Sequence, residues 1–410
     1  MRRLTADRPL LSMTSELGQV MAWGRAREQA GERVLHLERG EPDFDTPGFI
    51  TEALAAAARA GETHYPDARG TQALRQALVE KLGRENGIAC EPDDVVITAG
   101  GTHALFLTFQ ALLAPGDELL ALSPHWMAIP KLVAFAPGAS LRAFPAYLEL
   151  LEETWSPEEF AQRLRAALRP GTRGLYVNTP NNPSGAVLTR AQLEALAAVA
   201  IERDLWVLAD EAYEHILFDG TKHVSLASLP GMAERTVSIY TMSKSYAMTG
   251  WRVGYAVAPP AMRPALAPLL AFYTTHGVFP ASQIAAREAV KGSQACVEEM
   301  RAAYEQRRAL LLRGLADSKT VHAPTPKGAF YAFANVKATR GERDLWAMVD
   351  EWLGFGVAAL PGTAFGPEYG DWVRLSLATR ADDVAEGAKR IAKHAGDPRA
   401  GAPAGATARA

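Results

Sequence analysis

Residues 236–258 read TVSIYTMSKSYAMTGWRVGYAVA. Two nearly continuous apolar runs enclose a polar segment, in which Lys244 lies between two serines and Arg252 follows eight positions later. Short apolar runs of this kind predict buried strands. A lysine directly after a buried strand is costly unless its amine is solvated, paired with a carboxylate or used in covalent catalysis. The stretch alone leaves these three interpretations of Lys244 open.

Similar apolar runs occur toward the N-terminus and alternate with helical patterns. Strands are indicated at DVVITAG (94–100), DELLALS (117–123), RGLYVN (173–178) and LWVLAD (205–210), and helices at residues 49–60, 71–86, 103–113 and 190–204. Strands that are nearly continuously apolar are typical of a parallel sheet covered by helices on both faces. We therefore predict an α/β fold with a large domain built on a mostly parallel sheet.

The sequence changes in character after about residue 290. A long helix rich in arginine, glutamate and leucine leads into three strand-like runs, AFYAFANV (329–336), GVAALPG (356–362) and WVRLSLA (372–378). This pattern predicts a smaller α+β domain. The predicted boundaries are an N-terminal arm at 1–13, the N-terminal part of the small domain at 14–45, the large domain at 46–287, the small C-terminal domain at 288–395 and a disordered tail at 396–410.

Composition and charge exclude several classes of function. The 410 residues carry a formal net charge of -3, which gives no electrostatic basis for binding nucleic acid or an anionic membrane. The two cysteines form no disulfide framework, and the nine histidines lack metal-ligand spacing, so we expect no metal. No apolar run approaches the roughly 18 residues of a membrane helix, and no signal peptide is apparent. We therefore expect a cytoplasmic protein.

Polar residues follow three of the other predicted strands, where sheets of this type bind ligands. GGTH (100–103) opens a predicted helix and suits an anion, although a tight turn needs the same glycines. NTPNNPSG (178–185) is typical of a turn of specific geometry. In DEAYEH (210–215) a carboxylate and a phenol lie three residues apart, although Asp210 could equally cap a helix. Each motif alone therefore also has a purely structural interpretation.

Taken together in chain order, these motifs resemble those of the fold-type I pyridoxal-phosphate enzymes. The glycine pair, the NNPSG turn, the D-x-x-Y pair, the Ser-Lys pair with its arginine and a late VRLS run (373–376) all match. The closer similarity is to class I/II aminotransferases of the aspartate aminotransferase branch. GEPDFDTP (40–47), SPHWMAIP (123–130) and MTGWRVGYA (248–256) add to it. The resemblance covers roughly residues 15–395 and implies the fold-type I architecture.

This resemblance implies pyridoxal 5'-phosphate as the cofactor and assigns roles to four residues. Lys244 would form the Schiff base with the cofactor and then carry protons to and from the substrate's α carbon. Asp210 would keep the pyridine nitrogen protonated, so that the ring can accept electrons. Tyr213 and Asn182 would donate hydrogen bonds to the cofactor's phenolic oxygen.

The resemblance also implies a phosphate site and a stacking residue. The N–H groups of Gly101 and Thr102 would bind the phosphate at a helix start, together with Thr241 and Arg252. The family usually has serine or glycine where this chain has Thr241, and the threonine hydroxyl still suits the site. Trp126 would stack on the cofactor ring.

Further residues are implied to bind the substrate or a second subunit. Arg374 would bind the α-carboxylate that every amino acid carries, because a planar guanidinium fits a carboxylate with two hydrogen bonds. Gly40 would lie close to the substrate, where a side chain would intrude, and Asn182 would contact it. Tyr65 would reach the phosphate of the neighbouring subunit, which implies an obligate homodimer with shared active sites.

The reaction that the resemblance favours is transamination between an L-amino acid and a 2-oxo acid by a ping-pong mechanism. A related branch of aspartate aminotransferases has lysine at the position of Thr102, so we expect a donor that is not strictly aspartate. His103 and His125 could contact a substrate, but packing or hydrogen-bonding roles are favoured.

Two alternatives to transamination remain. The first is a lyase or biosynthetic specialist of the same family, which would eliminate, cyclise or oxidise an amino acid. The second is a non-catalytic regulator that binds the cofactor. Such regulators typically carry a DNA-binding module, and the roughly 40 residues before the large domain are too few and not basic enough for one. Lys244, Asp210 and Arg374 are also all present, so the regulator is disfavoured.

Overall fold

The computed structural model describes residues 15–274 and 276–395. Its contacts divide the chain into two compact units. Within the described residues, unit 1 comprises Glu41–Tyr304 and Pro326–Tyr331, and unit 2 comprises 15–40, Glu305–Thr325 and 332–395. The predicted arm (1–13) and tail (396–410) lie outside the described residues, and the domain boundaries predicted at 45 and 287 stay predictions.

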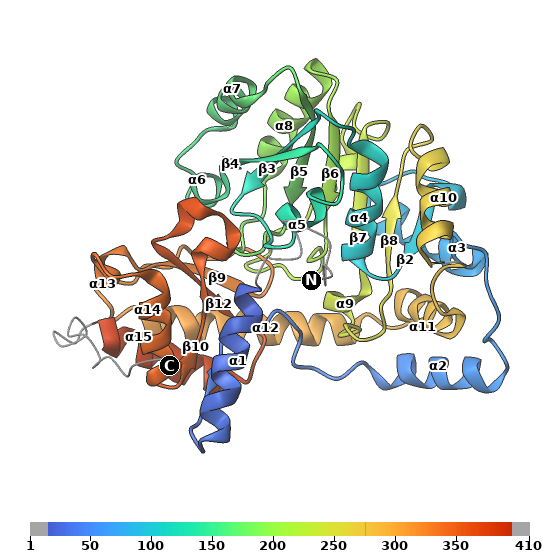
Figure 1. The fold of residues 1–410 in the computed structure, drawn as a ribbon. Coiled ribbons are helices and arrows are strands. Elements are labelled where there is room, and N and C mark those ends of the chain that lie inside the picture. The colour runs from blue at the N-terminus through green and yellow to red at the C-terminus, as the bar shows by residue number, and fades with distance from the viewer. Residues whose placement is uncertain (1–14, 275, 396–410) are drawn as a thin grey trace, which may run out of the picture. The chain divides into compact units, whose positions relative to one another are not determined.

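Unit 1 is built on a seven-stranded sheet with the strand order β2-β8-β7-β6-β5-β3-β4 (Figure 1). The strands are β2 (Val95–Thr98), β3 (Glu118–Ser123), β4 (Ser140–Pro145), β5 (Thr172–Asn178), β6 (Trp206–Asp210), β7 (Thr236–Thr241) and β8 (Gly254–Val257). The run from β7 to β4 is parallel, and β8 is antiparallel to both of its neighbours. The mostly parallel sheet expected from the sequence is confirmed.

Helices cover both faces of this sheet. On one face lie α4 (Gly101–Leu112), α5 (Ile129–Val133) and α10 (Arg263–Thr274), and on the other α6 (Tyr147–Leu151), α7 (Pro157–Ala167) and α8 (Arg190–Glu202). Alternate strand residues belong to the two apolar clusters: Tyr176 packs with the first set of helices, and Leu175 and Val177 with the second. Because both faces of the sheet's interior are buried, its central strands are nearly continuously apolar, as the sequence indicated.

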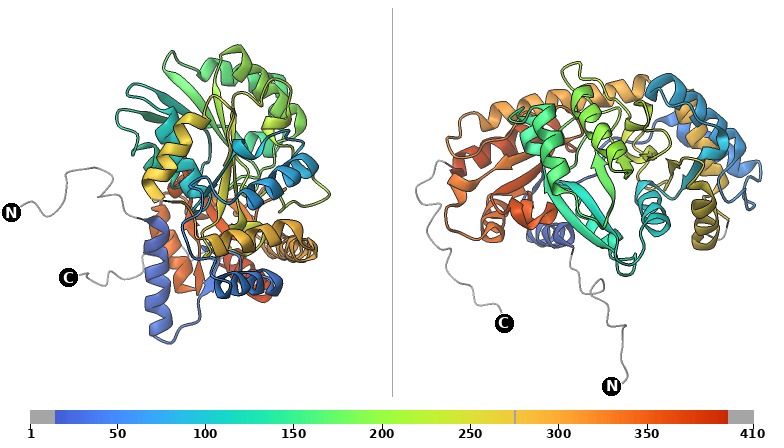
Figure 2. Two further views of the ribbon diagram at one scale, coloured as in Figure 1. Left: turned by 90° about the vertical axis from the view of Figure 1, so that its right-hand side faces the viewer. Right: turned by 90° about the horizontal axis from the view of Figure 1, so that it is seen from above.

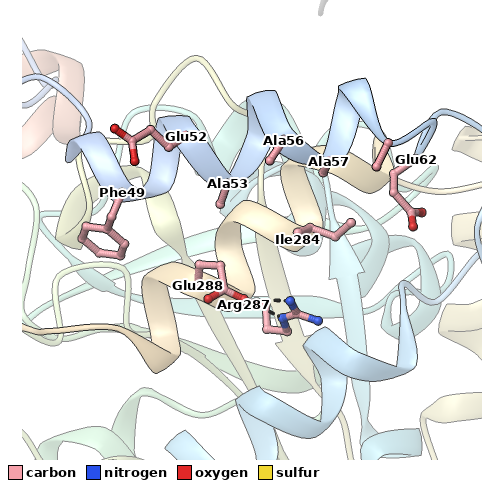
Figure 3. Close-up of a pocket in the computed structure, with 10 residues that line it drawn as sticks. Phe49, Glu52, Ala53, Ala56, Ala57, Glu62, Ile284, Arg287 and Glu288 are labelled. Atoms are coloured by element: carbon pink, nitrogen blue, oxygen red, sulfur yellow. Dashed lines mark hydrogen bonds and ion pairs between the residues drawn. The ribbon is translucent and has the colours of Figure 1, made fainter.

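A third apolar cluster packs α2 (Gly48–Arg59), α3 (Gln72–Lys81) and α11 (Pro280–Lys291) around β2 and β8. The helices α2 and α11 lie side by side (Figures 1 and 2). Figure 3 shows the alanine-rich face of α2 above Ile284 of α11, with the Arg287–Glu288 ion pair (2.8 Å) beside it. The groove there has a volume of about 720 Å³, and no predicted site residue lines it.

The helix predicted at 71–86 is not one continuous α-helix. The α-helical part ends at Lys81, and a π-helical turn, Leu82–Asn86, follows it. Gly87, with φ of 66°, terminates this turn in the left-handed conformation that glycine adopts most readily. Two short 3-10 helices in the same unit are Pro92–Asp94 and Leu226–Ser228, and the short helix α9 is Met242–Ser245.

Unit 2 contains two small sheets. In the first, β1 (Leu35–His36) pairs in parallel with β10 (Val357–Ala358), and the second has the order β11 (Leu360–Pro361), β12 (Trp372–Ser376), β9 (Tyr331–Asn335). The accompanying helices are α1 (Glu16–Gln29), α13 (Lys337–Arg340), α14 (Leu345–Gly354) and α15 (Ala381–Ala395), with 3-10 helices at Gly362–Phe365 and Pro367–Tyr369. Helix α12 (Ala295–Leu315) contributes its residues up to Tyr304 to unit 1 and the rest to unit 2.

Candidate active site

Two predicted catalytic residues of unit 1 lie at the carboxyl ends of neighbouring strands. Asp210 is the last residue of β6. Lys244 lies in α9, which follows directly after β7, and β7 pairs with β6. Parallel strands end at the same edge of a sheet, where ligands bind in folds of this type. The topology therefore brings Asp210 and Lys244 to one edge.

Asp210 is a buried carboxylate with two hydrogen-bond donors. The Tyr176 hydroxyl donates to Oδ2 at 2.7 Å, and the Ala212 N–H donates to Oδ1 at 3.3 Å. Burial raises the pKa of Asp210 to about 6, although the hydrogen bond from Tyr176 and the charge of Lys244 act in the opposite direction. The carboxylate is therefore mostly ionised at neutral pH and suits a cationic partner.

Lys244 is half-buried at the start of the polar segment after β7. Its Nζ lies 5.7 Å from the centre of the Phe330 ring, and its charge lowers the pKa of Asp210. The Thr241 hydroxyl caps α9 by accepting a hydrogen bond from the Ser243 N–H at 3.2 Å. This cap fixes the start of the short helix and with it the position of the lysine.

Tyr213 follows β6 and Asn182 follows β5, and both residues are buried. The Tyr213 hydroxyl lies 3.2 Å from the hydroxyl of Tyr331. The Asn182 N–H donates to Oδ1 of Asn178 at 2.8 Å, and Nδ2 of Asn178 donates to the carbonyl of Asp210 at 2.9 Å. One asparagine side chain thus attaches the NNPSG turn to the end of β6.

Gly100 and Arg252 form a closely packed corner at the start of α4. Gly100 is the N-cap residue and has φ of 93°. The Arg252 guanidinium donates to the carbonyls of Thr249 at 2.7 Å and Ala99 at 2.9 Å, and a Cβ on Gly100 would collide with its Nη2 atom. The φ of Gly100 favours glycine, and a side chain there would displace the Arg252 guanidinium from its present position. The corner places a cation beside a helix N-terminus, an arrangement suited to an anion.

Gly101 and Thr102 form the first turn of α4. A Cβ on Gly101 would lie 3.6 Å from Cβ of Thr241, so the helix start lies close to the end of β7. His103 accepts a hydrogen bond from the Ala99 N–H through Nδ1 at 3.1 Å, and burial lowers the pKa of this histidine. This hydrogen bond attaches the histidine ring to the turn before α4, and a structural role for His103 stays a prediction.

Trp126 is half-buried and packs against the apolar cluster on the α4 face of the sheet. His125 is buried, with Nδ1 at 3.3 Å from the carbonyl oxygen of Trp126. Nδ2 of Asn181 donates to the Pro124 carbonyl at 3.2 Å. The loop that carries Trp126 is therefore attached to the turn that carries Asn182.

Tyr65 differs from the other predicted site residues of unit 1 because its side chain is 78% exposed. Its ring lies 4.5 Å from the ring of His276. Large exposed aromatic side chains also occur at Phe272, Tyr273 and Phe279. Exposed apolar surface of this kind is typical of an interaction site.

In unit 2, Arg374 is a buried residue of β12. Its Nη2 donates to the carbonyl of Glu38 at 2.5 Å, and its guanidinium lies 5.1 Å from the centre of the Phe365 ring. Gly40 follows Glu38 by two residues in the same unit. The two predicted substrate residues of unit 2 are therefore connected through one short segment.

The sequence analysis assigned no role to three residues that contact the predicted site: Tyr176, Asn178 and Tyr331. Tyr176 and Asn178 lie on the same face of β5, and two residues with polar groups on one face of a buried strand are a signal that could have identified them. Tyr331 gives no such signal, because it lies far along the chain in a run of aromatic and alanine residues.

Metal and membrane sites were both expected to be absent. Among the described residues, no group of three or more histidine, cysteine, aspartate or glutamate side chains is placed to hold a metal ion. In the same part of the chain, no helix is both long and apolar enough to cross a membrane.

Comparison with known proteins identifies the family. Residues 32–391 match the model of aminotransferase class I and II. An arginine–pyruvate transaminase of Pseudomonas aeruginosa is 40% identical over 90% of this chain and 91% of its own length. An aspartate/prephenate aminotransferase of Thermus thermophilus is 39% identical over 96% of this chain and 97% of its own length. The solved aspartate aminotransferase of Rhizobium meliloti superposes with a TM-score of 0.89 at 32% identity, covering 96% and 99% of the two chains.

The parallel sheet, its helical layers and these matches define a fold-type I enzyme. The chain belongs to the class I and II aminotransferase family, and its activity is that of an aminotransferase. The family resemblance read from the sequence is thereby confirmed.

Proposed function

We propose that this chain uses pyridoxal 5'-phosphate to move the amino group of an L-amino acid to a 2-oxo acid by a ping-pong mechanism. One observation carries the proposal: a buried carboxylate, Asp210, and a half-buried amine, Lys244, meet at one edge of the sheet and interact through their charges. An amine in such a setting is suited to a Schiff base with a carbonyl compound. A buried carboxylate is suited to a cationic ring nitrogen.

The residues present fit the cofactor at its other end as well. At the corner between Gly100 and Arg252, the absence of a side chain on the glycine lets the guanidinium lie beside a helix N-terminus. These are the features that a phosphate group requires. Gly101 and Thr102 would bind the phosphate through their N–H groups, and Thr241 would bind it through its hydroxyl.

The cofactor, when bound, supplies a ring that withdraws electrons from the substrate's α carbon. Lys244 would hold the cofactor through its amine and move a proton to and from that carbon. Asp210 would hold a proton at the ring nitrogen. Tyr213 and Asn182 would bind the phenolic oxygen, and Trp126 would cover one face of the ring.

Substrate binding is assigned to Arg374, Gly40 and Asn182. The Arg374 guanidinium is held by the Glu38 carbonyl and lies near the Phe365 ring, so it is preorganised to bind a carboxylate. We propose that the donor is not strictly aspartate. The relatives support a wide choice, because one is named for arginine and pyruvate and another for aspartate and prephenate.

We further propose a homodimer in which Tyr65 of each subunit completes the phosphate site of the other. The exposure of Tyr65, together with the nearby exposed aromatic residues, supports an interface there. A cytoplasmic location also stays a prediction from the sequence.

The direct test of the proposed function is the Lys244→Ala variant. Borohydride reduction of the unaltered protein with bound pyridoxal phosphate should attach the cofactor irreversibly, and peptide mapping should find it on Lys244. In the variant we expect no attached cofactor and a loss of aminotransfer activity of at least about a thousandfold, because both covalent attachment and proton transfer are lost.

Lys222→Ala is a matched control, because Lys222 is exposed and lies outside the strand-end motifs. This variant should behave like the unaltered protein in both measurements. Cofactor attached by borohydride to the Lys244→Ala variant would show that another lysine is the covalent residue.

A further inference from the structure

The hydrogen bond between Tyr176 and Asp210 lies outside the roles that the proposed function assigns. The Tyr176 hydroxyl donates to Oδ2 of Asp210 at 2.7 Å, and the tyrosine is fully buried. In the register of β5 and β6, Tyr176 lies opposite Leu208 and Asn178 lies opposite Asp210. Tyr176 is therefore the diagonal neighbour of Asp210, and its long side chain reaches the carboxylate across the two strands.

We propose that Tyr176 is a positioning residue that holds the Asp210 carboxylate ionised and oriented toward the ring nitrogen of the cofactor. This inference rests on the proposed function, because it assumes that Asp210 binds that nitrogen. The proposal makes β5 a contributor to the cofactor site through Tyr176, which acts on Asp210 and need not touch the cofactor.

The geometry favours an orienting role. Tyr176 belongs to the interior of the sheet and packs in the apolar cluster with Leu208 and Ile239, so its hydroxyl is fixed by a rigid element. Within the part of the chain that the structure describes, the other oxygen of Asp210 accepts a longer bond, which the Ala212 N–H donates at 3.3 Å. The shorter bond from Tyr176 therefore fixes the rotation of the carboxylate.

The chemistry favours an ionising role. A hydroxyl donor stabilises the charged form of a carboxylate, whereas burial opposes it. Burial also raises the pKa of Tyr176 well above its usual value, so the tyrosine stays protonated and remains a donor. Glu211 and Lys244 also act on Asp210 through their charges. Tyr147 and Tyr213 are the other titratable groups that interact with the Tyr176–Asp210 pair.

The neighbouring carboxylate, Glu211, offers an internal comparison. Its Oε2 accepts hydrogen bonds from Ser225 at 2.5 Å and Tyr240 at 2.9 Å, and His223 Nε2 lies 2.7 Å away. Tyr240→Phe therefore removes a buried tyrosine–carboxylate bond one residue away from Asp210 and leaves other partners in place. It is the matched control for Tyr176→Phe.

The experiment measures the dissociation constant of pyridoxal phosphate by absorbance between pH 5 and 9. It is repeated with an analogue in which carbon replaces the ring nitrogen. For Tyr176→Phe we expect about tenfold weaker binding of pyridoxal phosphate at pH 8, the value of one hydrogen bond to a charged group. We expect the loss to grow as the pH falls toward 6, because removing the Tyr176 donor raises the pKa of Asp210, so that less of it is ionised there than in the unaltered protein. Binding of the analogue, which has no nitrogen for Asp210 to contact, should not change.

Three outcomes would overturn the inference. Equal losses for pyridoxal phosphate and for the carbon analogue would show that Tyr176 only supports packing. An equal loss of pyridoxal phosphate affinity in Tyr240→Phe would also overturn the inference. The third such outcome is unchanged affinity in Tyr176→Phe with a normal circular dichroism spectrum. If the unaltered protein fails to bind pyridoxal phosphate, the proposed function fails together with this inference, whereas the other outcomes leave the proposed function intact. Should Tyr176→Phe fold poorly, Tyr176→Met, which keeps an apolar side chain there, replaces it in the same comparison.

Discussion

Asp210 and Glu211 are adjacent buried carboxylates with different surroundings. Glu211 shares one oxygen among the hydroxyls of Ser225 and Tyr240 and the ring of His223. Asp210 accepts one short bond from Tyr176, and burial raises its pKa to about 6. A pKa raised by burial means that the protein does not fully stabilise the charged form of the group. Such groups cluster at functional sites, where a ligand can supply the missing interaction. The hydrogen-bond partners thus distinguish Asp210, which is suited to bind a ligand, from Glu211, which is suited to a structural role.

The raised pKa of Asp210 predicts that its ionised carboxylate lowers the free energy of unfolding when the cofactor is absent. The unfolded carboxyl has a pKa near 3.8, and folding raises it to about 6. Between these values the folded protein binds more protons than the unfolded chain, so stability falls as the pH rises through this window. Asp210→Asn should therefore raise the free energy of unfolding of the cofactor-free protein at pH 8, by up to about 3 kcal/mol, and change it little at pH 4.

Urea unfolding at both pH values checks this prediction. Glu211→Gln is the comparison, because it disturbs a carboxylate that already has several partners and should lower stability at pH 8. The account of Asp210 is wrong if Asp210→Asn is the less stable protein at pH 8.

At the scale of elements, one buried ion pair connects α3 to the segment after β6. Lys81, the last residue of α3, lies 2.6 Å from both oxygens of Glu214, and the two side chains are 3% and 10% exposed. Asn86, in the π-helical turn, also donates to Glu214 at 2.7 Å. Glu214 directly follows Tyr213, so this pair fixes the backbone that carries a predicted cofactor residue.

Lys81→Met should therefore be strongly destabilising, by about 3 kcal/mol, because it leaves a buried carboxylate without its cation. The effect should depend on pH. Burial alone would raise the pKa of Glu214, but Lys81 and other partners lower it to about 2. The stabilisation that the ionised Glu214 contributes is thus fully present above pH 4.5, the usual pKa of a glutamate. It is lost as the pH falls toward 2.

Urea unfolding at pH 7 and pH 3 measures this difference. Lys327→Met is the matched control, since Lys327 makes an exposed pair with Asp219 at 3.7 Å, with side chains 43% and 45% exposed. Exposed pairs contribute about 0–1 kcal/mol, so this variant should differ little from the unaltered protein. Equal losses in the two lysine variants would mean that the buried pair has no special role.

At the scale of the whole molecule, distant segments of the chain form each unit. Residues 15–40 belong to the same unit as 332–395, and Pro326–Tyr331 belongs to the unit of the large sheet. Arg374 consequently contacts the Glu38 carbonyl, and Tyr213 lies beside Tyr331. Such long-range contacts follow from the packing of elements and not from local patterns.

The sequence predicted what depends on local pattern. Apolar runs predicted the strands, and the glycines and polar residues after them predicted the strand-end motifs, because parallel strands place those residues at one edge. It did not predict that Tyr176 reaches Asp210, since that contact depends on the register of β5 against β6. It also did not predict the break in the helix at Lys81, since the π-helical turn there is held by contacts that Lys81 and Asn86 make with Glu214.

The central claim is that a cofactor held by Lys244 accepts and returns an amino group. The most direct measurement is the visible absorbance of the protein with bound pyridoxal phosphate, titrated with each standard amino acid in the absence of a 2-oxo acid. We predict that one or a few amino acids convert the cofactor to its amine form, and that pyruvate or 2-oxoglutarate then restores the original spectrum. Release of ammonia or consumption of oxygen without the amine form would contradict transamination.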